Sequence, residues 1–239
     1  MRRGVFLAAA LGLATLAGPA AAASPVVVEL FTAQGCASCG EASAHTAALA
    51  RENDVLVLTW SVDYWDYLGW KDTFAKPEFA ERQRAYAERL GVAEVYTPQV
   101  VVDGRAQTPA VKADDVRALL REARRVRRDP PQMVFRSDDR VAVGSGRAPR
   151  GGAEIWLVRY DPKEQSIEVK DGDNRGHTVA ERDVVVQLER LGAWRGRPVL
   201  LAMPPPSETG LKTVVLVQGV HGGRIVGVLQ EDGARVARR

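Results

Sequence analysis

The chain has 239 residues, 46% of them hydrophobic, with 33 basic and 30 acidic side chains. This length can bury one large core or two of ordinary size, and the near balance of charge excludes a strongly basic nucleic-acid-binding protein. Only two cysteines occur, three positions apart, so a framework of several disulfides is excluded as well.

The first 23 residues have the pattern of a secretory signal peptide. Two arginines precede an uncharged apolar run over residues 4–17, and four alanines follow at 20–23. The apolar run is shorter than the about 20 residues that a membrane-spanning helix needs. We expect residues 1–23 to be removed on export, which leaves 31 basic and 30 acidic residues and no membrane span. The protein is then periplasmic or secreted; a retained N-terminal anchor is the alternative.

Residues 24–129 alternate between strand and helix patterns. Continuous apolar runs predict buried strands, and apolar side chains at helical spacing predict helices. The predicted strands cover residues 26–32, 55–62 and 99–102, the last closed by an Asp-Gly turn. The predicted helices cover residues 41–51, 78–90 and 113–127. We therefore expect an α/β domain with a mixed sheet and flanking helices.

The pattern changes after Asp129-Pro130-Pro131, which marks a break in the chain. Short apolar runs separated by Gly, Pro, Asn and Asp predict many short strands, as in a β-sandwich. These runs cover residues 132–143, 153–160, 166–170, 183–188, 198–203, 213–219 and 224–230. Residues 184–191 also fit a helix. We expect a β-rich, sandwich-like second domain over residues 130–239.

The cysteine pair carries the sharpest chemical signal. Cys36-Ala37-Ser38-Cys39 follows a predicted strand and opens a predicted helix. A helix N-terminus stabilises a thiolate, so Cys36 is the expected nucleophile and Cys39, one turn on, the expected resolving cysteine. The alternatives are a structural disulfide and a metal site, the latter needing a further ligand such as His45.

Thr97 and Pro98 form a second signal, directly before the predicted strand over residues 99–102. A proline in this place can adopt the cis form. A Cys-x-x-Cys pair between strand and helix, followed much later by such a proline, resembles a thioredoxin-like fold. In that fold the proline faces the cysteines, so Pro98 would shape the site and Thr97 would offer backbone hydrogen bonds to substrate.

Two acidic residues are candidates for a proton relay to the cysteines. Glu29 lies inside the first predicted strand and Asp63 follows the second. A buried carboxylate is costly unless it is paired or protonated, and a raised pKa suits proton transfer. For both residues the alternative is a structural hydrogen bond.

Residues 64–70 gather four large aromatic side chains after the second predicted strand: Tyr64, Trp65, Tyr67 and Trp70. The carboxyl edge of an open α/β sheet is where ligands bind. The rings, Trp65 foremost, could hold an extended peptide; the alternative is that they form a lid packed on the core.

Four segments resemble blocks of a secreted bacterial family catalogued as domain of unknown function 1223. They cover residues 28–39, 62–72, 82–86 and 96–104. The resemblance implies a thioredoxin-like domain joined to a β-rich domain and implies no particular reaction. This chain departs from the family at Gly40-Glu41, where prolines are common, and the Glu41 charge competes with a Cys36 thiolate for the helix dipole.

These observations favour an exported thiol–disulfide oxidoreductase that needs no cofactor. Its partners would be protein thiols or disulfides, with no nucleic acid. The alternatives are a non-catalytic binding module with a permanent disulfide, and a metal carrier.

Overall fold

A computed structural model describes residues 24–126, 129–137 and 139–231; the predicted signal peptide, residues 1–23, lies outside them. The helices are α1 (Cys39–Leu49), α2 (Pro77–Leu90) and α3 (Ala113–Arg125), with a short 3-10 turn, η1 (Asp66–Leu68). The strands of the first half are β1 (Val26–Thr32), β2 (Val55–Ser61), β3 (Gln99–Val102) and β4 (Ala106–Pro109). Those of the second half are β5 (Met133–Ser137), β6 (Arg140–Val143), β7 (Ala153–Asp161), β8 (Gln165–Glu168), β9 (Thr178–Glu181), β10 (Val184–Trp194), β11 (Val199–Ala202), β12 (Lys212–Gly219) and β13 (Ile225–Gln230).

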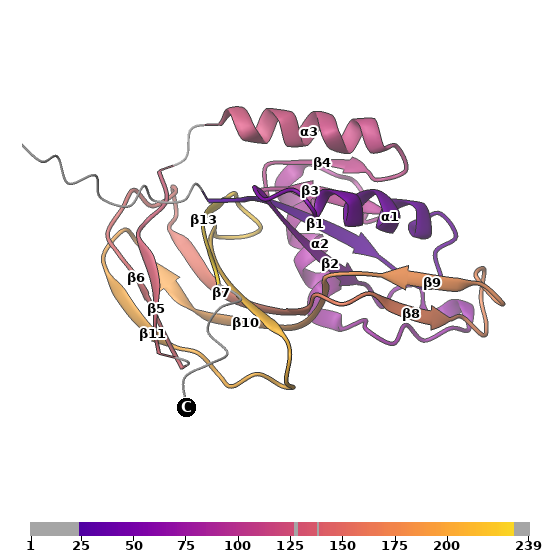
Figure 1. Cartoon of the computed structure of the whole chain (residues 1–239). Coiled ribbons are helices and arrows are strands. Elements are labelled where there is room, and N and C mark those ends of the chain that lie inside the picture. Colours follow the sequence, from indigo (N-terminus) through magenta and orange to yellow (C-terminus); the bar gives the residue numbers. More distant parts are fainter. Residues whose placement is uncertain (1–23, 127–128, 138, 232–239) are drawn as a thin grey trace, which may run out of the picture.

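An eight-stranded mixed sheet is the centre of the fold, in the order β13-β12-β7-β10-β2-β1-β3-β4 (Figure 1). In its first-half part, β1 pairs parallel with β2 and antiparallel with β3. Every residue of β1 and β2 is buried, which explains their continuous apolar runs. Helices α1 and α3 pack against one face of these strands and α2 against the other. The prediction of a mixed α/β fold is confirmed.

The sheet continues from the first half of the chain into the second. Val184 of β10 pairs with Thr59 of β2, and the Thr59 amide donates to the Asp183 carbonyl over 2.9 Å. The Thr59 hydroxyl donates to the Arg182 carbonyl over 2.6 Å. The sheet therefore runs across the predicted boundary between residues 129 and 130. Residues 184–191, for which a helix was the alternative, are strand.

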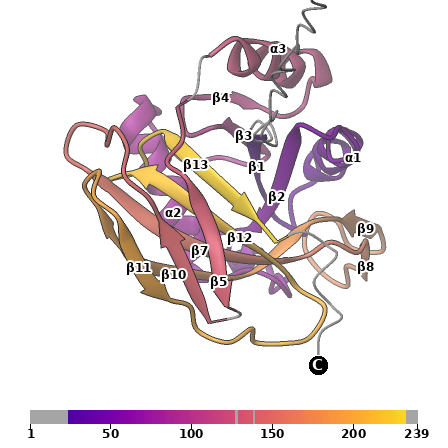
Figure 2. The ribbon, with the colours of Figure 1, turned by 60° about the vertical axis from the view of Figure 1, so that its left-hand side comes forward.

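A second layer covers the β-rich part of the sheet. The three-stranded sheet β11-β6-β5 faces β7, β10 and β12 across a cluster of buried apolar side chains (Figure 2). Trp194 lies fully buried in this cluster, and its indole N–H donates to the Gly144 carbonyl over 3.0 Å. The run over residues 132–143, predicted as one strand, forms β5 and β6, which pair as a hairpin.

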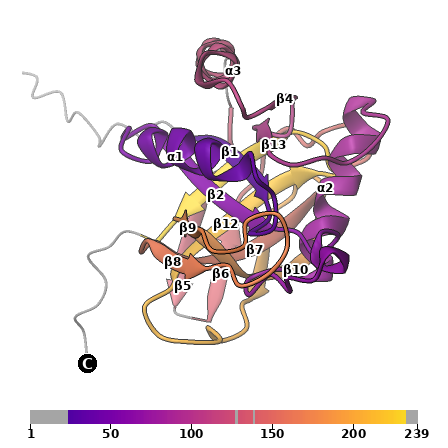
Figure 3. The same ribbon diagram turned by 90° about the vertical axis from the view of Figure 1, so that its right-hand side faces the viewer.

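Two short polar strands, β4 and β9, are absent from the predictions. The predicted turn at Asp103 and Gly104, with φ of 50° and 63°, leads from β3 into β4. Among the described strands, β9 pairs only with β8, in a hairpin that lies beside α1 (Figure 3). This hairpin brings the second half of the chain to the cysteine pair.

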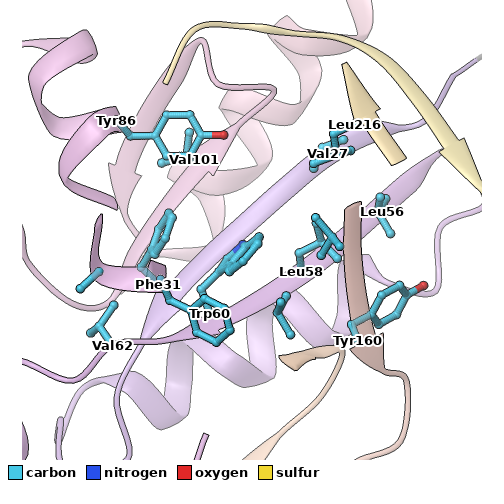
Figure 4. Packing of buried hydrophobic residues seen from close by; sticks show 14 of the residues in the cluster. Val27, Phe31, Leu56, Leu58, Trp60, Val62, Tyr86, Val101, Tyr160 and Leu216 are labelled. Atoms are coloured by element: carbon cyan, nitrogen blue, oxygen red, sulfur yellow. The ribbon is translucent and has the colours of Figure 1, made fainter. Parts of the chain in front are cut away.

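Aromatic side chains fill the core between α2 and the sheet (Figure 4). Phe31 and Trp60 stack with their ring centres 6.3 Å apart, and Phe79 meets Trp60 edge to face at 5.2 Å. Tyr160 of β7 and Leu216 of β12 belong to the same cluster, so both halves of the chain share this core. None of the described helices has the length and apolar character that crossing a membrane would require.

Candidate functional site

Cys36 and Cys39 form a disulfide between the end of β1 and the start of α1. Cys39 is the first residue of α1, and its amide donates to the Cys36 carbonyl over 3.1 Å. Cys36 lies in the turn that leads into the helix, with its sulfur 3.7 Å from the Ser38 hydroxyl. The pair therefore stands at a helix N-terminus, as the sequence predicts. Each cysteine is only 1% exposed, so neither sulfur faces solvent in this oxidised state.

Thr97 and Pro98 lie at the same end of the sheet as the cysteines. The Thr97–Pro98 peptide bond is cis, the form that the sequence allows for. Gln99 pairs with Phe31 near the end of β1, so Pro98 comes beside the strand end from which the cysteine turn departs. Pro98 is buried, and the Thr97 hydroxyl is buried without a hydrogen-bond partner among the described residues.

The aromatic segment after β2 packs over the cysteine turn. Trp65 contacts the apolar cluster that contains both cysteines, and its indole N–H is buried without a partner in the described chain. Trp70 donates its indole N–H to the Gln34 side-chain carbonyl over 2.9 Å. Tyr67, in contrast, is 82% exposed. Most of this segment thus forms a lid, and Tyr67 alone of its four rings projects into solvent.

Asn174, in the second half of the chain, holds the cysteine turn through two hydrogen bonds. It lies in the β8–β9 connection, and its side-chain amide donates to the carbonyls of Gln34 and Cys36 over 2.7 and 3.0 Å. Its partners lie 140 and 138 positions away along the chain, so no local pattern could have indicated it.

The two predicted relay residues have different surroundings. Glu29 is fully buried and accepts hydrogen bonds from the Arg82 Nε, over 2.7 Å, and from the Tyr86 hydroxyl. These partners support the structural alternative for Glu29, because they satisfy a buried carboxylate. Asp63 is half-buried at the end of β2, and its backbone carbonyl accepts the Asp66 amide over 3.1 Å. The relay role of both residues stays a prediction.

A second pair of buried carboxylates, Asp72 and Glu181, lies near the cysteine turn. Asp72 accepts the Gln34 amide over 2.7 Å, and burial raises its pKa. Glu181 is 1% exposed; its Oε2 lies 3.5 Å from the Ser61 hydroxyl and its Oε1 has no partner in the described chain. Burial, and then the neighbouring Asp72 charge, raise the pKa of Glu181 to about 8, so it holds its proton at neutral pH. Sequence reasoning missed Glu181 because it sits in the short polar strand β9.

Within the described part of the chain, no group of three or more His, Cys, Asp or Glu side chains is arranged to hold a metal ion.

Several solved chains resemble this fold, two of which are described below. The crystal structure of the protein AGR_C_4864 from Agrobacterium tumefaciens is 30% identical, with a TM-score of 0.71, over 92% of this chain and 99% of that one. HBP35 of Porphyromonas gingivalis, at 12% identity and a TM-score of 0.57, covers 87% of this chain and 74% of its own, and shows the fold alone.

No curated protein matches the chain significantly. The family model described as "Protein of unknown function (DUF1223)" matches residues 27–218, which is most of the chain. The Cys-x-x-Cys turn, the aromatic segment and the cis proline all lie within that match, and the chain belongs to the DUF1223 family.

Proposed function

We propose that the protein is an exported, thioredoxin-like thiol–disulfide oxidoreductase that acts on protein substrates. The observation that carries the proposal is the Cys36–Cys39 pair at the N-terminus of α1, at the sheet end where the cis Thr97–Pro98 bond leads into β3. The unpaired amides and the dipole of a helix N-terminus favour a thiolate there. This supports Cys36 as nucleophile and Cys39 as resolving cysteine.

The exchange proceeds in two steps. In the reduced protein, the Cys36 thiolate attacks a substrate disulfide, which forms a mixed disulfide and releases one substrate thiolate. Cys39, deprotonated, then attacks the Cys36 sulfur, which forms the Cys36–Cys39 disulfide and releases the second substrate thiolate. The substrate disulfide gains two electrons and the cysteine pair loses two. The reverse sequence oxidises a substrate dithiol.

The surrounding residues have proposed roles in this scheme. Trp65 and Pro98 shape the surface around the sulfurs, and Thr97 offers its backbone to an extended substrate. Asp63 remains a proposed proton relay, whereas the hydrogen bonds from Arg82 and Tyr86 favour the structural alternative for Glu29. Because each cysteine is 1% exposed, the segment containing Trp65 or the Asn174 turn must move aside before a substrate reaches Cys36.

Burial of the sulfurs also favours a second candidate function, a binding module with a permanent disulfide. A structural bridge needs no access, whereas an exchange centre does. The two functions differ in what happens when one cysteine is removed.

A trapping experiment distinguishes them. Cys39→Ser leaves Cys36 without its resolving partner, so we expect it to accumulate mixed disulfides with exported proteins, visible as bands that dithiothreitol removes. Cys36→Ser is the matched control and should accumulate far fewer. If both single variants show only the monomer band, the oxidoreductase proposal fails and the binding module stands.

A further inference from the structure

We propose that the groove between α1 and β9 holds an extended segment of the polypeptide substrate, paired with the outer edge of β9. This inference rests on the proposed exchange at Cys36 and names a substrate subsite for it. The second half of the chain supplies one wall of this subsite, because β9 lies beside α1 (Figures 1 and 3).

The groove starts beside the cysteine pair. It has a volume of about 430 Å³, within the range of ligand sites. The wall on the α1 side consists only of small residues: Ala37, Gly40, Ser43, Ala44 and Ala47. Its opposite wall is β9 with the residues on either side of it, including Asn174. Since Ala37 adjoins Cys36 and Asn174 donates to the Cys36 carbonyl, a segment in the groove lies next to the reacting turn.

The edge of β9 is prepared to accept another strand. The Val169 amide donates to the His177 carbonyl, which makes this a hydrogen-bonded pair of the antiparallel hairpin. Hydrogen-bonded and non-hydrogen-bonded pairs alternate, so the Thr178 and Ala180 pairs with β8 are non-hydrogen-bonded. The N–H and C=O groups of Thr178 and Ala180 therefore point away from β8. An unpaired strand edge is a template for an extended peptide, as in β-augmentation.

Two residues that line the groove carry buried polar atoms without partners among the described residues. Glu181 Oε1 and Ser43 Oγ make no hydrogen bond within the described chain, although both residues line the groove. A buried polar atom without a partner is costly. A polypeptide backbone brings both amide donors and carbonyl acceptors at regular spacing, so it can satisfy a protonated carboxyl and a hydroxyl together. This combination favours an extended polypeptide as the occupant.

Two pairs of variants, one pair in the β8–β9 hairpin and one in α1, test the proposal by their effect on the rate of thiol–disulfide exchange. Ala180→Pro removes the outward N–H of β9, whereas Ser166→Pro removes the outward N–H of β8 on the far edge of the same hairpin. Ala44→Trp fills the groove, whereas Ala48→Trp places the same ring one helical turn further along α1, at a position that does not line the groove. The measured quantity is the rate at which reduced, unfolded ribonuclease A reduces the Cys36–Cys39 disulfide, divided by the rate at which dithiothreitol reduces it. We expect Ala180→Pro and Ala44→Trp to lower this ratio about ten-fold and both controls to keep it. A wild-type ratio in Ala180→Pro and Ala44→Trp would overturn the proposal.

A binding measurement separates this inference from the proposed chemistry. Unfolded ribonuclease A with all its cysteines carboxymethylated cannot exchange disulfides. Added to the oxidised wild-type protein, it should shift or broaden the amide resonances of Thr178 and Ala180 more than those of Ser166 and Glu168. Binding at β9 without any turnover would sink the oxidoreductase proposal and leave the groove assignment intact. Turnover without any change in the resonances of Thr178 and Ala180 would overturn the groove assignment and leave the oxidoreductase proposal intact.

Discussion

At the scale of single residues, the site combines a local motif with contacts that no local pattern reveals. The cysteine pair could be predicted from the sequence because its chemistry depends on a strand before it and a helix after it, both of which are visible in nearby residues. Glu181 and Asn174 could not, because they reach the site from strands and turns more than a hundred positions away. Glu29 could be singled out as a buried acid, but its partners Arg82 and Tyr86 could not be identified in advance.

Glu181 should make stability depend on pH in a specific way. Its pKa is about 8 in the folded protein against an ordinary value of 4.5, chiefly because of burial. Between these two values the unfolded chain releases the proton while the folded protein keeps it, so stability falls as pH rises from 4.5 to 8. Glu181→Gln removes this loss. The free energy of unfolding of Glu181→Gln relative to wild type should therefore rise by about 3–6 kcal/mol between pH 4 and pH 9.

Urea denaturation at several pH values measures this difference. Glu164→Gln is the matched control, because Glu164 is an exposed residue lining the same groove. A difference between Glu181→Gln and wild type that is flat across this pH range would show that Glu181 is not a buried, protonated acid.

At the scale of elements, the β8–β9 hairpin sets how accessible the cysteines are. Asn174→Ala removes two hydrogen bonds that hold the cysteine turn, each worth about 0.5–1.5 kcal/mol. The turn should then open more often, and dithiothreitol should reduce the disulfide about ten-fold faster. Asp173→Ala, at the exposed neighbouring position, should reduce at the wild-type rate. Equal rates for Asn174→Ala and wild type would mean that this hairpin does not restrict access.

The two strands that the sequence patterns do not predict, β4 and β9, were missed for the same physical reason. Strands β4 and β9 are short and carry polar side chains, so neither has the continuous apolar run that marks β1 and β2. Their strand conformation comes from pairing with β3 and β8 rather than from burial on both faces. The apolar pattern of residues 184–191 fits both a strand and a helix. This segment forms strand β10 because it pairs along its length with β7.

At the scale of the whole molecule, the two halves are joined through one sheet and one core. The described helices all end before residue 129, and the described part of the chain beyond it is built of strands. The sequence could not show that β10 would pair with β2, because strand partners depend on contacts between distant segments. Leu58 and Trp60 of β2 therefore pack in the same cluster as Tyr160 and Leu216 of the second half.

A fragment of residues 24–129 should consequently not fold alone. It would expose the edge of β2 that pairs with β10, and it would lose Tyr160 and Leu216 from the cluster that contains Leu58 and Trp60. We expect the fragment to lack a cooperative urea transition, whereas residues 24–239 should unfold in a single step followed by tryptophan fluorescence and by circular dichroism alike. A sigmoidal transition in the isolated fragment, with buried tryptophan emission, would contradict this account.

The reduction potential of the Cys36–Cys39 pair tests the exchange proposal most directly. The purified protein would be equilibrated with defined ratios of reduced and oxidised glutathione, and the reduced fraction measured by alkylation. A working exchange centre should have a potential between about −120 and −270 mV. A value below about −300 mV would identify a structural bridge and contradict the proposed function.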